Sequence, residues 1–221
     1  MPPNLPFLHC SHPFPTMTTP IFMGMMSGTS LDGVDGVVAH IEPSGQLRVL
    51  AHSFVPFAPD FRNSLMQLNE SGDNELHRAA LAGNTISRHY AQVADDLLSQ
   101  TKLSPEHITA LGAHGQTVRH KPLEFDGDMA LQQTAVGYTI QLINPSLLAE
   151  LTGMDVVCDF RNRDLAAGGQ GAPLVPAFHQ GVFGRSDATV AVLNIGGIAN
   201  LSVLDPDGSA LGWDCGPGWP A

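Results

Sequence analysis

The sequence is poor in basic residues and in long apolar runs. Ten Lys and Arg stand against 21 Asp and Glu, which leaves a formal net charge of −11. Since no basic cluster is visible, we expect neither nucleic acid nor an anionic membrane surface as a partner. Every apolar run falls short of the ~20 residues that cross a bilayer. A bound polyphosphate would have to rely on backbone N–H donors and a metal ion.

Cysteine is also scarce, and several catalytic motifs are missing. Cys10, Cys158 and Cys215 lie far apart without CxxC spacing, which argues against a disulfide framework and a structural zinc site. A reduced, cytoplasmic setting is the expectation. The ten histidines show no HExxH spacing, so a transition-metal site is not expected. A serine hydrolase is excluded because no GxSxG segment is present.

The N-terminal segment differs from the rest of the chain. Its first 16 residues carry five prolines and no Lys or Arg, so they lack the charged start of a secretory signal. We predict that residues 1–19 are a disordered extension. Met17 lies just before the first apolar run and is an alternative initiator.

From residue 20 to residue 187, strand-like and helix-like patterns alternate, which predicts an α/β domain with a mixed sheet. The Asp73–Gln100 segment has apolar residues at steps of three and four, typical of a helix, and Asp73 or Asn74 can act as its cap. Residues 120–136 are polar and irregular and predict a loop. Strands are expected at 21–26, 34–41, 46–57, 109–113, 138–142 and 155–159, and further helices at 144–151 and 174–183.

At Ala188 the opening pattern restarts. Residues 191–214 again predict a strand, a glycine turn, a strand, a hairpin turn at Pro206–Gly208 and a third strand, as residues 23–50 do. Two copies of one three-stranded opening indicate an internal duplication. Residues 188–221 are therefore predicted to be the opening strands of a second, incomplete copy of the first domain.

Two glycine turns stand at corresponding points of the two copies. Such turns can direct backbone N–H groups at phosphate oxygens, and an aspartate, here Asp32, can hold Mg²⁺. Each alone could be an ordinary hairpin turn, and neither is a Walker loop, since no GxxxxGK[ST] segment occurs. The predicted nucleotide-binding residues are Ser27, Gly28, Thr29, Ser30, Leu31, Asp32, Gly33, Val34 and Asp35 in the first turn and Asn194, Gly196 and Gly197 in the second.

The pairing of turns resembles the acetate kinase, sugar kinase, Hsp70 and actin superfamily, which implies a ribonuclease H-like domain. A closer resemblance lies in GMMSGTSLDGVD, AHGQTVRH, VVCDFRNRDLAAGGQGAPLVPAFH, LNIGGIANLS and GWDCGPG, which occur in the order of the signature segments of anhydro-N-acetylmuramic acid kinases. This resemblance covers about residues 22–218. It implies ATP- and Mg²⁺-dependent phosphorylation of 1,6-anhydro-N-acetylmuramic acid with hydrolytic opening of its anhydro bridge, in peptidoglycan recycling.

The resemblance also assigns roles to single residues. Asp214 matches the aspartate proposed as the general base, although without the family it would be interpreted as a cap of the Gly-Pro-Gly turn. Four residues are candidates for contacts with the sugar, and their alternative is a surface Arg–Asp pair beside a solvated histidine. These candidates are His114, Gln116, Arg161 and Asp164.

The sequence departs from the family after Gly216-Pro217-Gly218. The family continues there with an Asn, a helix and the remainder of a second domain, whereas this sequence reads Trp219-Pro220-Ala221. We therefore expect little or no activity from this chain alone. A non-catalytic sugar-binding relic and one half of a split kinase remain alternatives, and the formation of a homodimer is left open.

Overall fold

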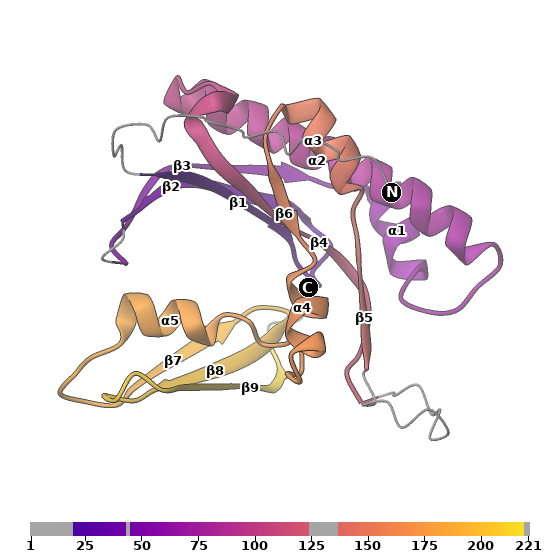
Figure 1. The fold of residues 1–221 in the computed structure, drawn as a ribbon. Coiled ribbons are helices and arrows are strands. Elements are labelled where there is room, and N and C mark those ends of the chain that lie inside the picture. Colours follow the sequence, from indigo (N-terminus) through magenta and orange to yellow (C-terminus); the bar gives the residue numbers. More distant parts are fainter. Residues whose placement is uncertain (1–19, 43–44, 124–136, 219–221) are drawn as a thin grey trace, which may run out of the picture.

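The computed structural model describes residues 20–42, 45–123 and 137–218, which form two β-sheets with helices (Figure 1). The larger sheet has six strands and the smaller has three. None of the helices in the described part of the chain is long and apolar enough to cross a membrane.

The larger sheet begins as an antiparallel meander and continues with both parallel and antiparallel pairs. β2 pairs antiparallel with β1 and β3, and β4 then pairs parallel with β1. β5 and β6 both pair with β4, the first antiparallel and the second parallel. The strands are β1 (Ile21–Ser27), β2 (Gly33–Ile41), β3 (Leu47–Pro56), β4 (Ile108–Lys121), β5 (Tyr138–Leu142) and β6 (Val156–Cys158). This mixed α/β arrangement, with β2 as the reversed strand beside β1, confirms the predicted fold class.

Helices cover one face of this sheet. Figure 1 shows α1 (Pro59–Gln67), α2 (Glu75–Thr101) and α3 (Pro145–Thr152) on the same side. Helix α2 buries an apolar stripe with helical spacing against the strands. That stripe contains Ile86, Tyr90, Val93 and Leu97, all fully buried. A short 3₁₀ turn, Pro105–His107, leads into β4.

The smaller sheet is a second meander, made of β7 (Val190–Ile195), β8 (Ile198–Leu204) and β9 (Ala210–Pro217). Both neighbouring pairs are antiparallel. Helix α5 (Pro176–Phe183) packs on one of its faces, where His179 Nδ1 lies 2.9 Å from Ser202 Oγ. Helix α4 (Phe160–Ala166) follows β6 and leads toward this second sheet (Figure 1).

Most predicted elements are confirmed, with differences at three places. Asn74 occupies the N-terminal cap position of α2 but makes no side-chain capping bond, so the predicted side-chain cap is wrong. Strand β4 runs on to Lys121, because its far end pairs with β5, and residues 120–121 are therefore strand instead of loop. Helices α1 and α4 were not predicted, and both are shorter than three turns.

Other predictions concern parts of the chain that the structure does not describe. The proposed disordered extension, residues 1–19, lies outside the described residues, as do residues 124–136 of the predicted loop. The division into domains at residues 187 and 188 stays a prediction.

Candidate active site

The first glycine turn connects β1 to β2 as a tight turn. Leu31 N donates to Gly28 O at 3.2 Å, and Ser30 Oγ donates to Asp32 Oδ1 at 2.7 Å. The left-handed residue of the turn is Leu31, with φ of 56°, and its side chain is buried. Gly28 does not have a positive φ, and a Cβ there would meet Ser30 Oγ at an ordinary 3.5 Å. Glycine at position 28 therefore leaves the backbone of the turn uncovered by a side chain, so that another group can come close to it.

A buried hydrogen-bond network fixes the start of this turn. Tyr90 Oη accepts from Gly115 N at 3.0 Å and lies 3.5 Å from Ser27 Oγ, which donates to Gly115 O at 3.2 Å. Burial raises the pKa of Tyr90 to about 12, outweighing these hydrogen bonds, so the phenol stays neutral. Helix α2 thereby joins the end of β1 to the His114–Gly115 segment of β4.

Two further side chains bind carbonyl groups of the turn. Gln116 is fully buried, and its Nε2 donates to Gly28 O at 3.1 Å. Arg62, on α1, donates from Nη2 to Ser30 O at 3.1 Å. With both carbonyls bound by the protein, the turn is held in one orientation. Gln116 was predicted to contact the sugar, whereas the contact in this structure is with the first turn. Arg62 was not predicted because α1 was not.

The second glycine turn lies directly against the first. A Cβ on Gly197 would come within 2.9 Å of Thr29 Oγ1. Gly218 N donates to Gly197 O at 3.1 Å, so the Gly-Pro-Gly segment is bonded to the second turn. The two turns, far apart in the sequence, thus meet at one place, as the kinase interpretation requires.

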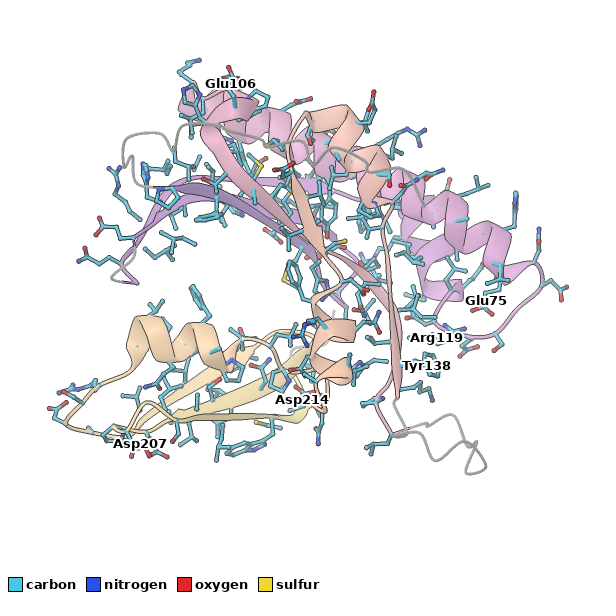
Figure 2. All side chains as sticks on the ribbon, viewed as in Figure 1. Glu75, Glu106, Arg119, Tyr138, Asp207 and Asp214 are labelled. Atoms are coloured by element: carbon cyan, nitrogen blue, oxygen red, sulfur yellow. The ribbon has the colours of Figure 1, made fainter. Side chains whose placement is uncertain are left out.

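Asp214 stands close to this meeting point. The strand register aligns it with Asn200 of β8, and Asn200 with Asn194 of β7, so the three residues form one row across the smaller sheet. A register shift between Ala199 and Asn200 accompanies this row. The Asp214 side chain is exposed, and Figure 2 shows it beside α4.

Arg161, on α4, is bonded to the larger sheet through His114. Its Nε donates to His114 Nε2 at 2.8 Å and its Nη1 to Gly171 O at 2.6 Å, while Nη2 makes no hydrogen bond with the described residues. Burial lowers the pKa of Arg161, and the charge of Asp214 acts in the opposite direction. Arg161 and His114 are thus hydrogen-bonded to each other, and the charge of Asp214 acts on Arg161.

Two histidines of β4 line this region in their neutral forms. Burial, with a smaller contribution from Arg161, lowers the pKa of His114, whose Nδ1 lies 2.7 Å from Gly115 O. The pKa of His120 is lowered mainly by burial and then by Arg161, with Asp214 opposing. His120 was not among the predicted site residues. Its signal was its place in the AHGQTVRH segment, which also contains the predicted residues His114 and Gln116.

Three predicted site residues lie away from the meeting point of the turns. Asp164 Oδ2 accepts from Gly171 N at 2.7 Å, so its carboxylate holds the loop after α4. Val34 is fully buried in the core. Asp35 lies within β2, where its Oδ1 is 3.0 Å from His52 Nε2. These positions do not test the predicted roles. The turn itself is formed by residues 28–32, between the end of β1 and the start of β2.

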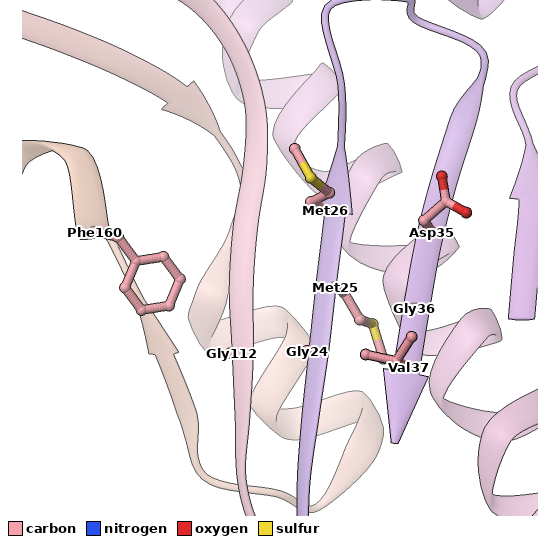
Figure 3. Close-up of a pocket in the computed structure, with 8 residues that line it drawn as sticks. All are labelled: Gly24, Met25, Met26, Asp35, Gly36, Val37, Gly112 and Phe160. Carbon is pink, nitrogen blue, oxygen red and sulfur yellow. The ribbon is translucent and has the colours of Figure 1, made fainter. Parts of the chain in front are cut away.

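An apolar cavity lies elsewhere, on the open face of the larger sheet (Figure 3). It has a volume of about 410 Å³, and Gly24, Gly36 and Gly112 are among the residues that line it. Met26, Val37 and Phe160 surround it, and Asp35 is its charged residue. Because neither Asp214 nor Arg161 lines it, this cavity does not carry the chemistry predicted for the site.

The carboxylate of the first turn suits a metal ion most of whose ligands come from a bound phosphate and from water. Within the described residues, no group of three or more His, Cys, Asp or Glu is arranged to hold a metal ion. Asp32 is exposed, and one of its carboxylate oxygens accepts from Ser30. Mg²⁺ is commonly bound by one or two carboxylates together with substrate phosphates and water. Asp32 therefore fits a magnesium ion that arrives with a nucleotide.

Comparison with known proteins gives one consistent result. The sequence profile of the family described as anhydro-N-acetylmuramic acid kinase matches residues 20–220. A protein of that name from Variovorax paradoxus is 60% identical over 91% of this chain and 53% of its own length. Relatives of the same name from Albidiferax ferrireducens and Neisseria meningitidis are 53% and 50% identical. The chain spans about half the length of the curated relatives it matches.

Proposed function

The chain belongs to the anhydro-N-acetylmuramic acid kinase family, and from that premise we propose that its two glycine turns and Asp214 serve ATP-dependent phosphorylation of 1,6-anhydro-N-acetylmuramic acid. The product is N-acetylmuramic acid 6-phosphate, because water opens the anhydro bridge in the same reaction. Such a role in peptidoglycan recycling takes place in the cytoplasm.

One observation carries this proposal: the turns that end β1 and β7 touch, with Gly197 against Thr29. Phosphoryl transfer depends mainly on positioning and on electrostatic stabilisation. Glycine turns can direct backbone N–H groups at phosphate oxygens, so two such turns that meet suit a polyphosphate. A chain with a net charge of −11 has no broad basic surface that could replace them.

The proposed chemistry divides between the two sheets. Asp214 accepts a proton from the water that attacks the anomeric carbon, and the bond from that carbon to O6 breaks. O6 then takes the γ-phosphoryl group of ATP, and ADP leaves. Arg161 is held by His114 and Gly171, and its Nη2 is suited to the lactyl carboxylate of the sugar.

Asp32 is the residue proposed to hold Mg²⁺, which when bound neutralises charge that develops on the phosphates. Gly28 and Gly196 leave the turns open, since a Cβ on either would have no neighbour closer than 3.5 Å. The hydrogen bonds from Gln116 and Arg62 to the first turn keep it in place when a phosphate approaches.

The test is to supply the rest of the family's length. The chain is fused to the part of the Variovorax paradoxus relative that follows its match, and 6-phosphate formation is followed by mass spectrometry with ATP, Mg²⁺ and the anhydro sugar. We expect turnover by the fused protein and little by the chain alone.

Omission of ATP or of Mg²⁺ serves as the control. Sugar binding by a well-folded fused protein that never forms the 6-phosphate would contradict the proposal. That outcome would favour a sugar-binding protein without catalytic activity.

A further inference from the structure

The guanidinium of Arg161 is held by two hydrogen bonds. Its Nε–H donates to His114 Nε2 at 2.8 Å, and Nη1 donates to Gly171 O at 2.6 Å. An arginine has five N–H bonds, so these two contacts leave three, both on Nη2 among them, without a partner in the described residues. Nη1 and Nη2 together therefore present a planar fork, with the geometry that binds a carboxylate.

The tautomer of His114 follows from its neighbours. Its Nδ1 lies 2.7 Å from Gly115 O, and since a carbonyl oxygen can only accept, Nδ1 carries the proton. Nε2 is then the unprotonated nitrogen, as the bond from Arg161 requires. Burial, with a smaller contribution from the charge of Arg161, lowers the pKa of His114 and favours this neutral form. The imidazole is thus held in the one state in which it can bind Arg161.

The same carbonyl connects His114 to the start of the first glycine turn. Gly115 O also accepts from Ser27 Oγ at 3.2 Å, and Gly115 N donates to Tyr90 Oη at 3.0 Å. Gly115 has a φ of 77°, and a Cβ there would come within 2.8 Å of Leu142 O, so glycine is needed beside His114. Helix α4 is thereby fixed to the end of β1 through a side chain of β4.

We propose that His114 is a positioning residue that decides which sugar is bound: it fixes Arg161 so that the fork meets the lactyl carboxylate, and so makes the site selective for a sugar with this group. The inference rests on the proposed function, which supplies the carboxylate. His114 acts through the orientation of Arg161 and takes no part in the transfer of the proton or of the phosphoryl group. Asp214, whose charge acts on Arg161, is the competing partner for the fork.

Two sugars separate this role from a general effect on the site. 1,6-Anhydro-N-acetylglucosamine has the ring of the proposed substrate without its lactyl carboxylate. In the fused protein, calorimetry should show that the sugar with the carboxylate binds about tenfold tighter or more. His114→Phe keeps a planar ring but removes the acceptor, so we expect it to abolish this preference. The affinity for the sugar without the carboxylate should stay the same.

Kinetics and a conservative variant test the positioning directly. His114→Phe should raise the KM for the carboxylated sugar about tenfold or more, with the KM for ATP unchanged and kcat within about threefold. His114→Gln should restore most of the preference, because its Oε1 can accept from Arg161 in place of Nε2.

The effect should pass through Arg161 alone. Arg161→Lys lacks the fork and should lose the preference to the same degree, so that adding His114→Phe to it has no further effect. Arg163→Gln is the matched control, since Arg163 is exposed on the same helix, and it should keep the preference. In the chain alone, NMR of the imidazole nitrogens should show His114 protonated on Nδ1.

Any of four results would overturn the inference. The fused protein could bind both sugars equally, which would leave Asp214 as the partner of the fork. His114→Phe could weaken both sugars to the same degree, as a purely structural role would. Arg163→Gln could lose the preference in place of Arg161→Lys, or His114 could be protonated on Nε2. Failure of the proposed function looks different: the fused protein would bind the carboxylated sugar selectively but never form the 6-phosphate.

Discussion

At the scale of single residues, the charge of Asp214 acts beyond its own sheet. Asp214 stands on β9 of the smaller sheet, yet its charge acts on His120 of β4 and on Arg161 of α4. His120 belongs to the larger sheet, and α4 follows directly after that sheet's last strand. The neutral state of His114 matters here, because its Nε2 can accept from Arg161 only when unprotonated. An acidic solution that protonates His114 would break that bond.

Replacing Asp214 by Asn keeps its size and hydrogen-bonding capacity but removes the proton acceptor. In the fused protein we expect turnover to fall by about 10² to 10⁴, the usual range for loss of a general base. Sugar affinity, measured by calorimetry, should change far less. Retention of most of the turnover would return Asp214 to the role of a turn cap and require another base.

Tyr90 should make stability depend on alkaline pH. Its pKa is raised from 10.0 to about 12 in the folded chain, so between these values the unfolded chain loses a proton that the folded chain keeps. The stabilisation is complete below pH 10 and is lost as the pH rises toward 12, by on the order of 2–3 kcal/mol. Chemical denaturation across this range measures it.

Two variants isolate that contribution. Tyr90→Phe should flatten the alkaline decline and cost about 1–3 kcal/mol at neutral pH, because it leaves the buried Gly115 N–H without its partner. Tyr138→Phe is the matched control, since Tyr138 is 41% exposed and should leave the profile unchanged. An equal alkaline decline in Tyr90→Phe would show that another group is responsible.

At the scale of elements, the site depends on how closely two turns approach. Position 197 has no space for a side chain, because its Cβ would lie 2.9 Å from Thr29 Oγ1. Gly197→Val should push the turns apart, and overpacking of this kind costs about 1–3 kcal/mol. We expect the KM for ATP of the fused protein to rise about tenfold or more, measured by steady-state kinetics.

The contact can be verified by a second substitution. Thr29→Ala removes the oxygen that Gly197→Val would meet, so the double variant should recover part of the lost affinity for ATP. Purely additive losses would mean that the turns do not touch in solution.

At the scale of the whole molecule, the presence of two similar meanders explains the placement of the site. Each meander ends its first strand in a glycine turn, and the segment containing α4 and α5 connects the second meander to the larger sheet. The two turns can then meet although each sheet is built locally. A strongly acidic chain gains local positive charge there from Arg62 and Arg161, each fixed by hydrogen bonds.

The sequence by itself determined the elements with strong local patterns. Apolar runs bounded by turn residues predicted the strands of both meanders, and apolar residues at steps of three and four predicted the long helix α2, because these patterns are local. The two glycine turns and the repeated opening were visible for the same reason. Short helices such as α1 and α4 have too few turns to show a period.

Only the tertiary structure decided how the site is assembled. Gln116 and Arg62 bind the first turn, and Asp164 holds its own loop, through bonds between residues that share no local pattern. The contact of Gly197 with Thr29 joins positions 168 residues apart, which no window of sequence contains. Such contacts follow from the packing of the two sheets, because hydrogen bonding and close approach depend on distances in space and not along the chain.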